Sequence, residues 1–198
     1  MTSLAEIASI YDEIYTNEPH YNIPDAHNKA KLKYILEYAK GVNGLVLDAG
    51  CGQGSALQHM WENGVDVIGI ELSRVICKAR PELWVINTDI ISHANEGHRY
   101  AGIVCTDVLE HIPQDQISQT LAALRKMSSS AFFGIANLSS IKCGHQLHLI
   151  REGVKWWART IQEHYSQIEV LRPNPEDETL VKSFNYERYF FIVAKSNE

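Results

Sequence analysis

Short apolar runs alternate with segments of helical periodicity along most of this chain. The runs are typical of strands that are buried on both faces of a parallel sheet. They predict strands at 44–48, 66–71, 83–86, 101–105, 131–136, 166–171 and 187–195. The periodic segments predict helices at 1–17, 26–40, 53–62, 73–80, 114–127 and 151–164. This alternation indicates an α/β protein with a twisted, mostly parallel sheet and helices on both faces.

The first predicted strand ends in a glycine-rich turn, the most informative segment of the chain. Asp48 closes the strand, and Gly50, Gly52 and Gly54 follow at alternate positions before a helix. Glycine lets the backbone turn sharply and pass close to a ligand where a Cβ would collide. Strand, turn and helix together predict a loop that binds a nucleotide-like ligand.

The charge and spacing of this loop indicate which ligand it takes. The third glycine of a dinucleotide site would fall where the chain has Ser55. Asp48 would repel a pyrophosphate but attract a ligand that carries an ammonium and a sulfonium group. The Gly-Lys-Ser/Thr of a P-loop does not follow the glycines. The loop therefore favours S-adenosylmethionine, whose demethylated product is S-adenosylhomocysteine, over NAD or ATP.

Three further acidic motifs follow at the ends of the next predicted strands. Glu71 ends the second strand, Asp89 follows the third and Asp107 follows the fourth. With the glycine loop, these ordered motifs resemble those of the class I S-adenosylmethionine-dependent methyltransferases from about Asn43 to Lys126. The resemblance implies a doubly wound, Rossmann-like fold. Its seven-stranded sheet would have the order 3-2-1-4-5-7-6, with strand seven antiparallel.

The resemblance also implies which side chains contact the cofactor. Glu71 is expected to accept hydrogen bonds from both ribose hydroxyls, and Asp89 from the adenine amino group, while the Ile90 amide meets a ring nitrogen. The alternatives are a surface acid at a strand end for Glu71 and a solvated loop acid for Asp89. The predicted cofactor residues are Asp48, Gly50, Cys51, Gly52, Gly54, Glu71, Leu72, Asp89, Ile90, Thr106, Asp107 and Tyr11.

The N-terminal segment contains three tyrosines, Tyr11, Tyr15 and Tyr21. In many proteins of the resembling family such a segment folds over the cofactor as a lid, which makes Tyr11 a cofactor-binding candidate. The alternative is an amphipathic helix that buries its aromatic faces against the sheet. Both interpretations stay open, because a lid must also present such a face to the site.

The segment after the fifth predicted strand carries the candidate catalytic residues. His145 and His148 lie where a Rossmann-like sheet exposes its ligand crevice, and imidazole is suited to take a proton near neutral pH. The alternative is that one of them caps the following helix or bonds a loop carbonyl. His111, close to Pro113, is expected to cap or pack at a helix entrance. The His-x-x-His spacing lacks a third ligand nearby, so no metal site is expected.

Composition narrows the choice of partners and compartment. The net charge is −6 and Lys and Arg do not cluster, which disfavours nucleic acid as a tight partner. Apolar runs fall short of the ~18–20 residues that a membrane span needs. The 4 cysteines are widely spread and match no metal-binding spacing, which is typical of a reducing, cytoplasmic setting.

Together these features predict a single methyltransferase domain over residues 1–198. It would comprise a helical lid or cap at 1–40, a cofactor-binding core at 41–136, and a substrate-side region with the closing strands at 137–198. The expected reaction moves a methyl group from S-adenosylmethionine to an oxygen or nitrogen of a small-molecule acceptor, in a monomer or homodimer. The alternatives are methylation of a protein or nucleic acid with a partner subunit, and cofactor binding without catalysis.

Overall fold

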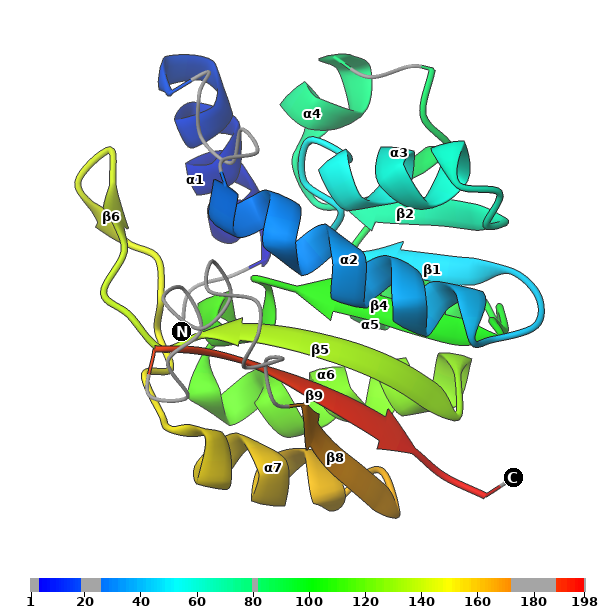
Figure 1. The fold of residues 1–198 in the computed structure, drawn as a ribbon. Coiled ribbons are helices and arrows are strands. Elements are labelled where there is room, and N and C mark those ends of the chain that lie inside the picture. The colour runs from blue at the N-terminus through cyan, green and yellow to red at the C-terminus, as the bar shows by residue number, and fades with distance from the viewer. Residues whose placement is uncertain (1–3, 19–25, 80–81, 172–187, 198) are drawn as a thin grey trace.

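The computed structural model describes residues 4–18, 26–79, 82–171 and 188–197, and its centre is a seven-stranded sheet (Figure 1). The strand order is β3-β2-β1-β4-β5-β9-β8. β1 pairs in parallel with β2 and β4, whereas β9 runs antiparallel to β5 and β8. The predicted order, with its antiparallel last strand, is confirmed. The strands are β1 (Val46–Ala49), β2 (Val67–Glu71), β3 (Val85–Asn87), β4 (Gly102–Thr106), β5 (Ser130–Ala136), β8 (Gln167–Leu171) and β9 (Tyr189–Lys195).

Helices cover both faces of the sheet. The helices are α1 (Leu4–Asn17), α2 (Ala26–Lys40), α3 (Ser55–Glu62), α4 (Arg74–Ala79), α5 (Ile90–Asn95), α6 (Ile117–Met127) and α7 (Val154–Gln162). Neighbouring strand residues point to opposite faces. Val46 therefore packs in one apolar cluster with α2 and α3, while Leu47 packs in another with α5, α6 and α7. Burial on both sides explains why the central strands are apolar at consecutive positions.

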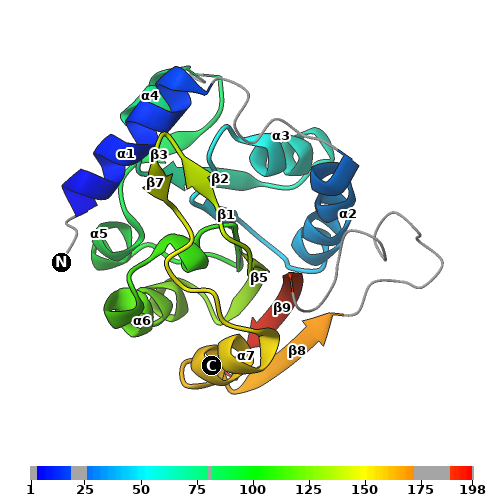
Figure 2. The same cartoon turned by 90° about the vertical axis from the view of Figure 1, so that its left-hand side faces the viewer.

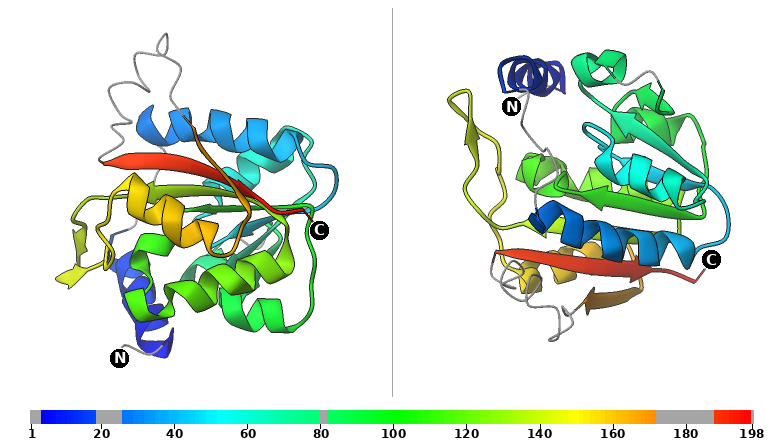
Figure 3. Two further views of the ribbon diagram at one scale, coloured as in Figure 1. Left: turned by 90° about the horizontal axis from the view of Figure 1, so that it is seen from below. Right: turned by 45° about the horizontal axis from the view of Figure 1, so that its top comes forward.

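α1 and a small hairpin lie beyond the carboxyl ends of the parallel strands (Figures 2 and 3). The hairpin consists of β6 (Ile141–Lys142) and β7 (His145–Gln146). Its turn residues Cys143 and Gly144 have φ values of 49° and 80°. Positive φ at both central residues is typical of a two-residue hairpin turn.

The sequence predicts neither α5 nor the hairpin. α5 has 6 residues and each hairpin strand has 2. Such short elements hold too few apolar positions to show a period. α5 begins where the Asp89 side chain caps it, with Oδ1 accepting the N–H groups of Ile91 and Ser92, both at 2.9 Å.

Other elements match the prediction to within a few residues at their ends. The helix expected at 114–127 starts with the 3-10 turn η2 (Gln114–Gln116), and α6 follows it. The helix expected at 151–164 is the shorter α7. Tyr21 lies outside the described residues. Within the described part of the chain, the helices are too short or too polar to cross a membrane.

Candidate active site

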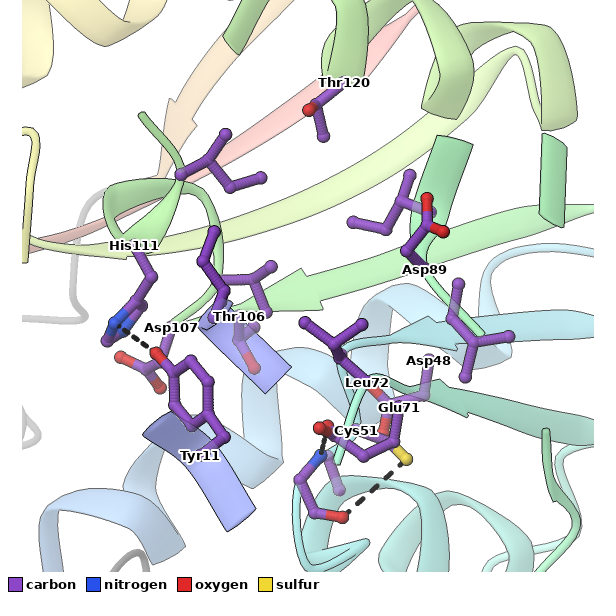
Figure 4. A pocket seen from close by; sticks show the side chains of 18 of the residues that line it. Tyr11, Asp48, Cys51, Glu71, Leu72, Asp89, Thr106, Asp107, His111 and Thr120 are labelled. Atoms are coloured by element: carbon purple, nitrogen blue, oxygen red, sulfur yellow. Dashed lines mark hydrogen bonds between the residues drawn. The ribbon is translucent and has the colours of Figure 1, made fainter. Parts of the chain in front are cut away.

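A pocket opens at the carboxyl ends of β1, β2 and β4, and α1 forms one of its walls (Figure 4). It brings together nearly all the residues that the sequence predicts to contact the cofactor. They are Tyr11, Asp48, Gly50, Cys51, Gly52, Glu71, Leu72, Asp89, Ile90, Thr106 and Asp107. These residues come from separate strand ends, which the parallel sheet places side by side.

Gly54 is the exception, because it does not line the pocket. It precedes α3 with a φ of 78°, and a Cβ at this position would lie 2.3 Å from Cδ1 of Leu83. Its contact with the cofactor stays a prediction. Gly54 is needed for the turn and for close packing against Leu83, which the motif alone does not distinguish from ligand contact.

The other two glycines shape the floor of the pocket. Gly50 has a φ of 76°, and a Cβ there would meet Cγ2 of Val108 at 2.5 Å. Gly52 has a φ of 51°, and its N–H donates a hydrogen bond of 2.9 Å to Oε2 of Glu71. The glycine loop therefore packs tightly against its neighbours while it exposes its backbone to the pocket.

Two buried carboxylates face this loop. Asp48 is 2% exposed, and its Oδ2 has no hydrogen-bond partner among the residues described. Burial and the nearby Glu71 charge raise the pKa of Asp48 to about 7. Glu71 accepts backbone N–H groups from Gly52 and Ser73, and its pKa is raised, chiefly by burial. A carboxylate oxygen can accept a second bond, so both side chains can still receive donors from a ligand.

Asp89 stands at the third strand end. Its Oδ1 caps α5, whereas Oδ2 receives no bond from the part of the chain that the structure describes. The alternative of a merely solvated acid is wrong, since the side chain has a structural role in starting a helix. Asp89 also lines the pocket, and its second oxygen can still accept a hydrogen bond.

Polar contacts hold α1 over the pocket. Asp12 accepts hydrogen bonds from Ser73 Oγ at 2.6 Å and from the Val75 amide at 3.2 Å, next to Glu71. On the other side, Lys142 of the hairpin lies 2.8 Å from Glu18. Tyr15 is 8% exposed and lines the pocket with Tyr11. The helix thus covers the site and buries aromatic surface at the same time.

The opposite end of the pocket is formed by Asp107 and a buried lysine. Asp107 has a φ of 56°, and its Oδ2 lies 2.7 Å from Lys31 Nζ and 3.3 Å from Tyr189 Oη. Lys31 is 7% exposed. The sequence analysis missed Lys31, although a lysine four residues before Ile35 interrupts the apolar face of the predicted helix.

His111 also belongs to this end of the pocket and not only to the helix entrance where it was expected. It ends the 3-10 turn η1 (Leu109–His111), and its Nδ1 lies 2.7 Å from Tyr11 Oη. Burial, followed by the neighbouring His148, lowers the pKa of His111 to about 3. The imidazole is therefore neutral at physiological pH.

Neither predicted catalytic histidine lines the pocket. His145 sits on the hairpin, with Nε2 3.3 Å from Oε2 of Glu13, because the hairpin turns it toward α1. His148 contacts the carbonyl oxygen of Leu138 at 2.6 Å, as the alternative interpretation expected. Its ring lies edge-on to His111, with the centroids 4.6 Å apart. His148 thus supports the pocket wall from behind.

Glu110 lies close to the rings of His111 and His148. Ligand atoms of Glu110, His111 and His148 all lie within 4.8 Å of one another. The sequence analysis expected no metal site because a third ligand was not near His148 in the chain. The fold supplies two candidates from η1, so that expectation rested on sequence distance and not on distance in space.

Comparison with known proteins finds a matching family model and relatives of similar sequence. A family model described as a methyltransferase domain matches residues 22–171. A ubiquinone biosynthesis O-methyltransferase of Vibrio campbellii is 34% identical over 121 residues, which are 56% of this chain and 52% of that protein. One from Escherichia coli is 29% identical over 168 residues, 79% of this chain and 63% of that protein. The chain thus spans about half the length of the first relative.

Solved structures show the same fold. A 1,6-didemethyltoxoflavin-N1-methyltransferase of Burkholderia thailandensis superimposes with a TM-score of 0.70 at 14% identity, over 100% of this chain and 92% of that chain. A magnesium protoporphyrin IX methyltransferase of Synechocystis does so with a TM-score of 0.68 at 14% identity, over 98% of this chain and 97% of the other. At such low identity, the likeness concerns the fold alone.

Proposed function

The chain belongs to the methyltransferase-domain family, and on this premise we propose that it transfers the methyl group of S-adenosylmethionine to an oxygen atom of a small-molecule acceptor. The observation that carries the proposal is the unpartnered, buried Oδ2 of Asp48 beside the glycine loop. A buried carboxylate oxygen without a donor is costly. A ligand with a cationic, N–H-donating end would remove that cost.

The remaining residues of this end fit the rest of the cofactor. Glu71 would accept the ribose hydroxyls with the lone pairs that its two backbone bonds leave free. Asp89 would accept the adenine amino group through Oδ2, and Leu72 and Ile90 would pack on the rings. Two hydrogen-bond-accepting carboxyl groups lie at the glycine loop, with no basic side chain beside them among the described residues, which suits a ligand without phosphate.

The bound cofactor would supply an electrophilic methyl group on a sulfonium, and the protein's residues would position the acceptor for in-line attack. Thr106, Asp107, His111 and Tyr11 lie on the side of the pocket away from Asp89, which we call the acceptor end (Figure 4). The carboxylate of Asp107 and the neutral ring of His111 would be the proton acceptors there. An oxygen acceptor is favoured because the relatives reported above are named O-methyltransferases.

Calorimetric titration with S-adenosylhomocysteine tests the cofactor assignment. The wild type should bind it, and Glu71→Gln should weaken binding about 10- to 100-fold, as expected for lost charge-assisted hydrogen bonds. Glu37→Gln, an exposed position on α2, is the matched control and should bind like the wild type. Absence of binding in the folded wild type, or stabilisation by NAD beyond that by S-adenosylhomocysteine, would refute the assignment.

A further inference from the structure

Glu110, His111 and His148 form a three-residue cluster behind the acceptor end of the pocket. Their ligand atoms lie within 4.8 Å of one another, although they come from η1 and from the segment between β7 and α7. Two backbone bonds hold the segments together, because the Glu110 carbonyl accepts the N–H groups of Leu149 at 2.7 Å and Ile150 at 3.1 Å. The cluster is therefore built into the fold.

Glu110 carries the clearest sign of a missing partner. Its side chain is fully buried, and Oε1 accepts the Ala136 N–H at 2.8 Å. Its Oε2 is also buried and meets no donor in the described ranges of the chain. Leaving one oxygen of a buried carboxyl unsatisfied is unfavourable. A group that can bind that oxygen is thus expected at this position.

His148 is held in the way that metal-binding histidines are held. Nδ1 of His148 lies 2.6 Å from the Leu138 carbonyl, which can only accept a hydrogen bond, so this nitrogen carries the proton. The lone pair is then on Nε2, the atom free to bind a ligand. Nδ1 of His111 is 2.7 Å from Tyr11 Oη, which fixes that ring from the pocket side.

A second acidic group lies close to the cluster. Asp107 is near enough to Glu110 to interact with it electrostatically, and Lys31 is the cation paired with Asp107. A divalent ion at the cluster would bind the unsatisfied Oε2 of Glu110, and the low-dielectric surroundings would strengthen that attraction.

We propose that Glu110, His111 and His148 bind a divalent transition-metal ion such as Zn²⁺ or Mn²⁺ at the acceptor end of the pocket. Two imidazoles and one carboxylate are a donor set that suits such ions and leaves coordination positions open. Because His111 lines the pocket, an open position would face the acceptor. The oxygen atom of the methyl acceptor would then complete the coordination of the ion. This last step rests on the proposed function.

A second cluster provides the necessary control. His93, Glu96 and His98 could also gather around an ion, but Glu96 and His98 are exposed and the group does not line the pocket. Exposed groups of this kind bind ions weakly or not at all, since nothing organises them in advance. His98→Gln therefore removes one ligand from the competing cluster without touching the proposed site.

The test is calorimetric titration of chelator-treated, cofactor-free protein with Zn²⁺, repeated with Mn²⁺. We expect saturable binding near one equivalent for at least one ion, weakened at least 10-fold by Glu110→Gln and by His148→Gln and unchanged by His98→Gln. Circular dichroism melts establish that each variant is folded. If Glu110→Gln does not fold, His148→Gln, a half-buried position, decides.

Two outcomes would overturn the proposal. One is the absence of saturable binding of either ion to folded wild type. The other is binding that is as tight in folded His148→Gln as in the wild type, whatever His98→Gln does. Titration of the same samples with S-adenosylhomocysteine separates this result from the proposed function, because cofactor binding with no metal binding refutes the metal site alone.

Discussion

The two ends of the pocket differ in how their charges are balanced. At the cofactor end, Asp48 and Glu71 are buried together without a basic side chain, and one oxygen of Asp48 has no partner among the described residues. At the acceptor end, Asp107 is already paired with Lys31 at 2.7 Å. Asp107 therefore has its cation within the protein, whereas burial without a cation raises the pKa of both carboxyl groups at the cofactor end.

The ends also differ in how the chain assembles them. The cofactor end is made from strand ends and short turns of the segment 46–90, in which Gly52 binds Glu71 directly. The acceptor end joins α1, α2, η1 and β9 through contacts between distant segments, such as Lys31 with Asp107 and Tyr189 with Asp107. Local motifs thus encode one half of the site, and tertiary packing creates the other.

The largest expected effect is at Gly50. Gly50→Ala should weaken S-adenosylhomocysteine binding by at least about 100-fold, because a Cβ would lie 2.5 Å from Val108 and force the loop to move. Gly64→Ala is the matched control, since Gly64 also has a positive φ, of 81°, but its Cβ would meet nothing within 4 Å. Both variants carry the backbone strain of about 1 kcal/mol, so calorimetry isolates the effect of the clash. Equal affinities would contradict the packed-loop account.

The next effect concerns the ion pair of the acceptor end. Lys31→Met should lower the free energy of unfolding by about 1–3 kcal/mol, because it leaves the partly buried Asp107 without its cation. The affinity for S-adenosylhomocysteine should change less than about threefold, which is less than the loss of an ordinary hydrogen bond of about 1 kcal/mol would cause. Urea denaturation and calorimetry measure the two quantities.

Lys33→Met is the control for that variant, because Lys33 lies on the same helix and is exposed. It should leave both quantities unchanged. A large loss of cofactor affinity in Lys31→Met would show that the two ends are not separate in the way described here.

The smallest effect is a pH dependence that arises at the cofactor end. The unfolded chain ionises its aspartates near pH 4, whereas Asp48 keeps its proton up to about pH 7 in the fold. Its burial therefore costs stability progressively as the pH rises from about 4 to 7. Asp48→Asn should raise the unfolding free energy of the cofactor-free protein by about 1–2 kcal/mol at pH 8, and by little at pH 4.

Thermal melts across this pH range, with the exposed Asp66→Asn as control, measure that dependence. The same Asp48→Asn protein should bind S-adenosylhomocysteine less tightly than the wild type. A variant that is less stable than the wild type at pH 8 would argue against an unpartnered carboxylate at this position.

These differences explain which parts of the molecule the sequence could reveal. The strands, the sheet order and residues such as Asp48 and Glu71 were predictable, because each depends on a short apolar run and the residue that ends it. The close packing of Gly54 was not predictable, since its packing partner Leu83 lies on a different segment of the chain. Spacing alone does not tell a ligand contact from a tight turn.

The arrangement of the acceptor end could not be predicted from the sequence for a related reason. His145 and His148 were expected at the pocket, but the hairpin turns His145 toward Glu13, and the segment after the hairpin places His148 against His111. Lys31 was missed because its partner Asp107 lies 76 residues away in the chain. Such pairs follow from how helices and loops pack on the sheet, and no local pattern carries that information.

The most direct test of the account is a crystal structure of the protein with S-adenosylhomocysteine. We expect both ribose hydroxyls within hydrogen-bonding distance of the Glu71 carboxylate, the adenine at Asp89, and the amino group near Asp48. The sulfur should face Thr106 and Asp107, toward the acceptor end. A ligand bound outside this pocket, or reversed so that its adenine lies against Asp107, would contradict the division of the site into these two ends.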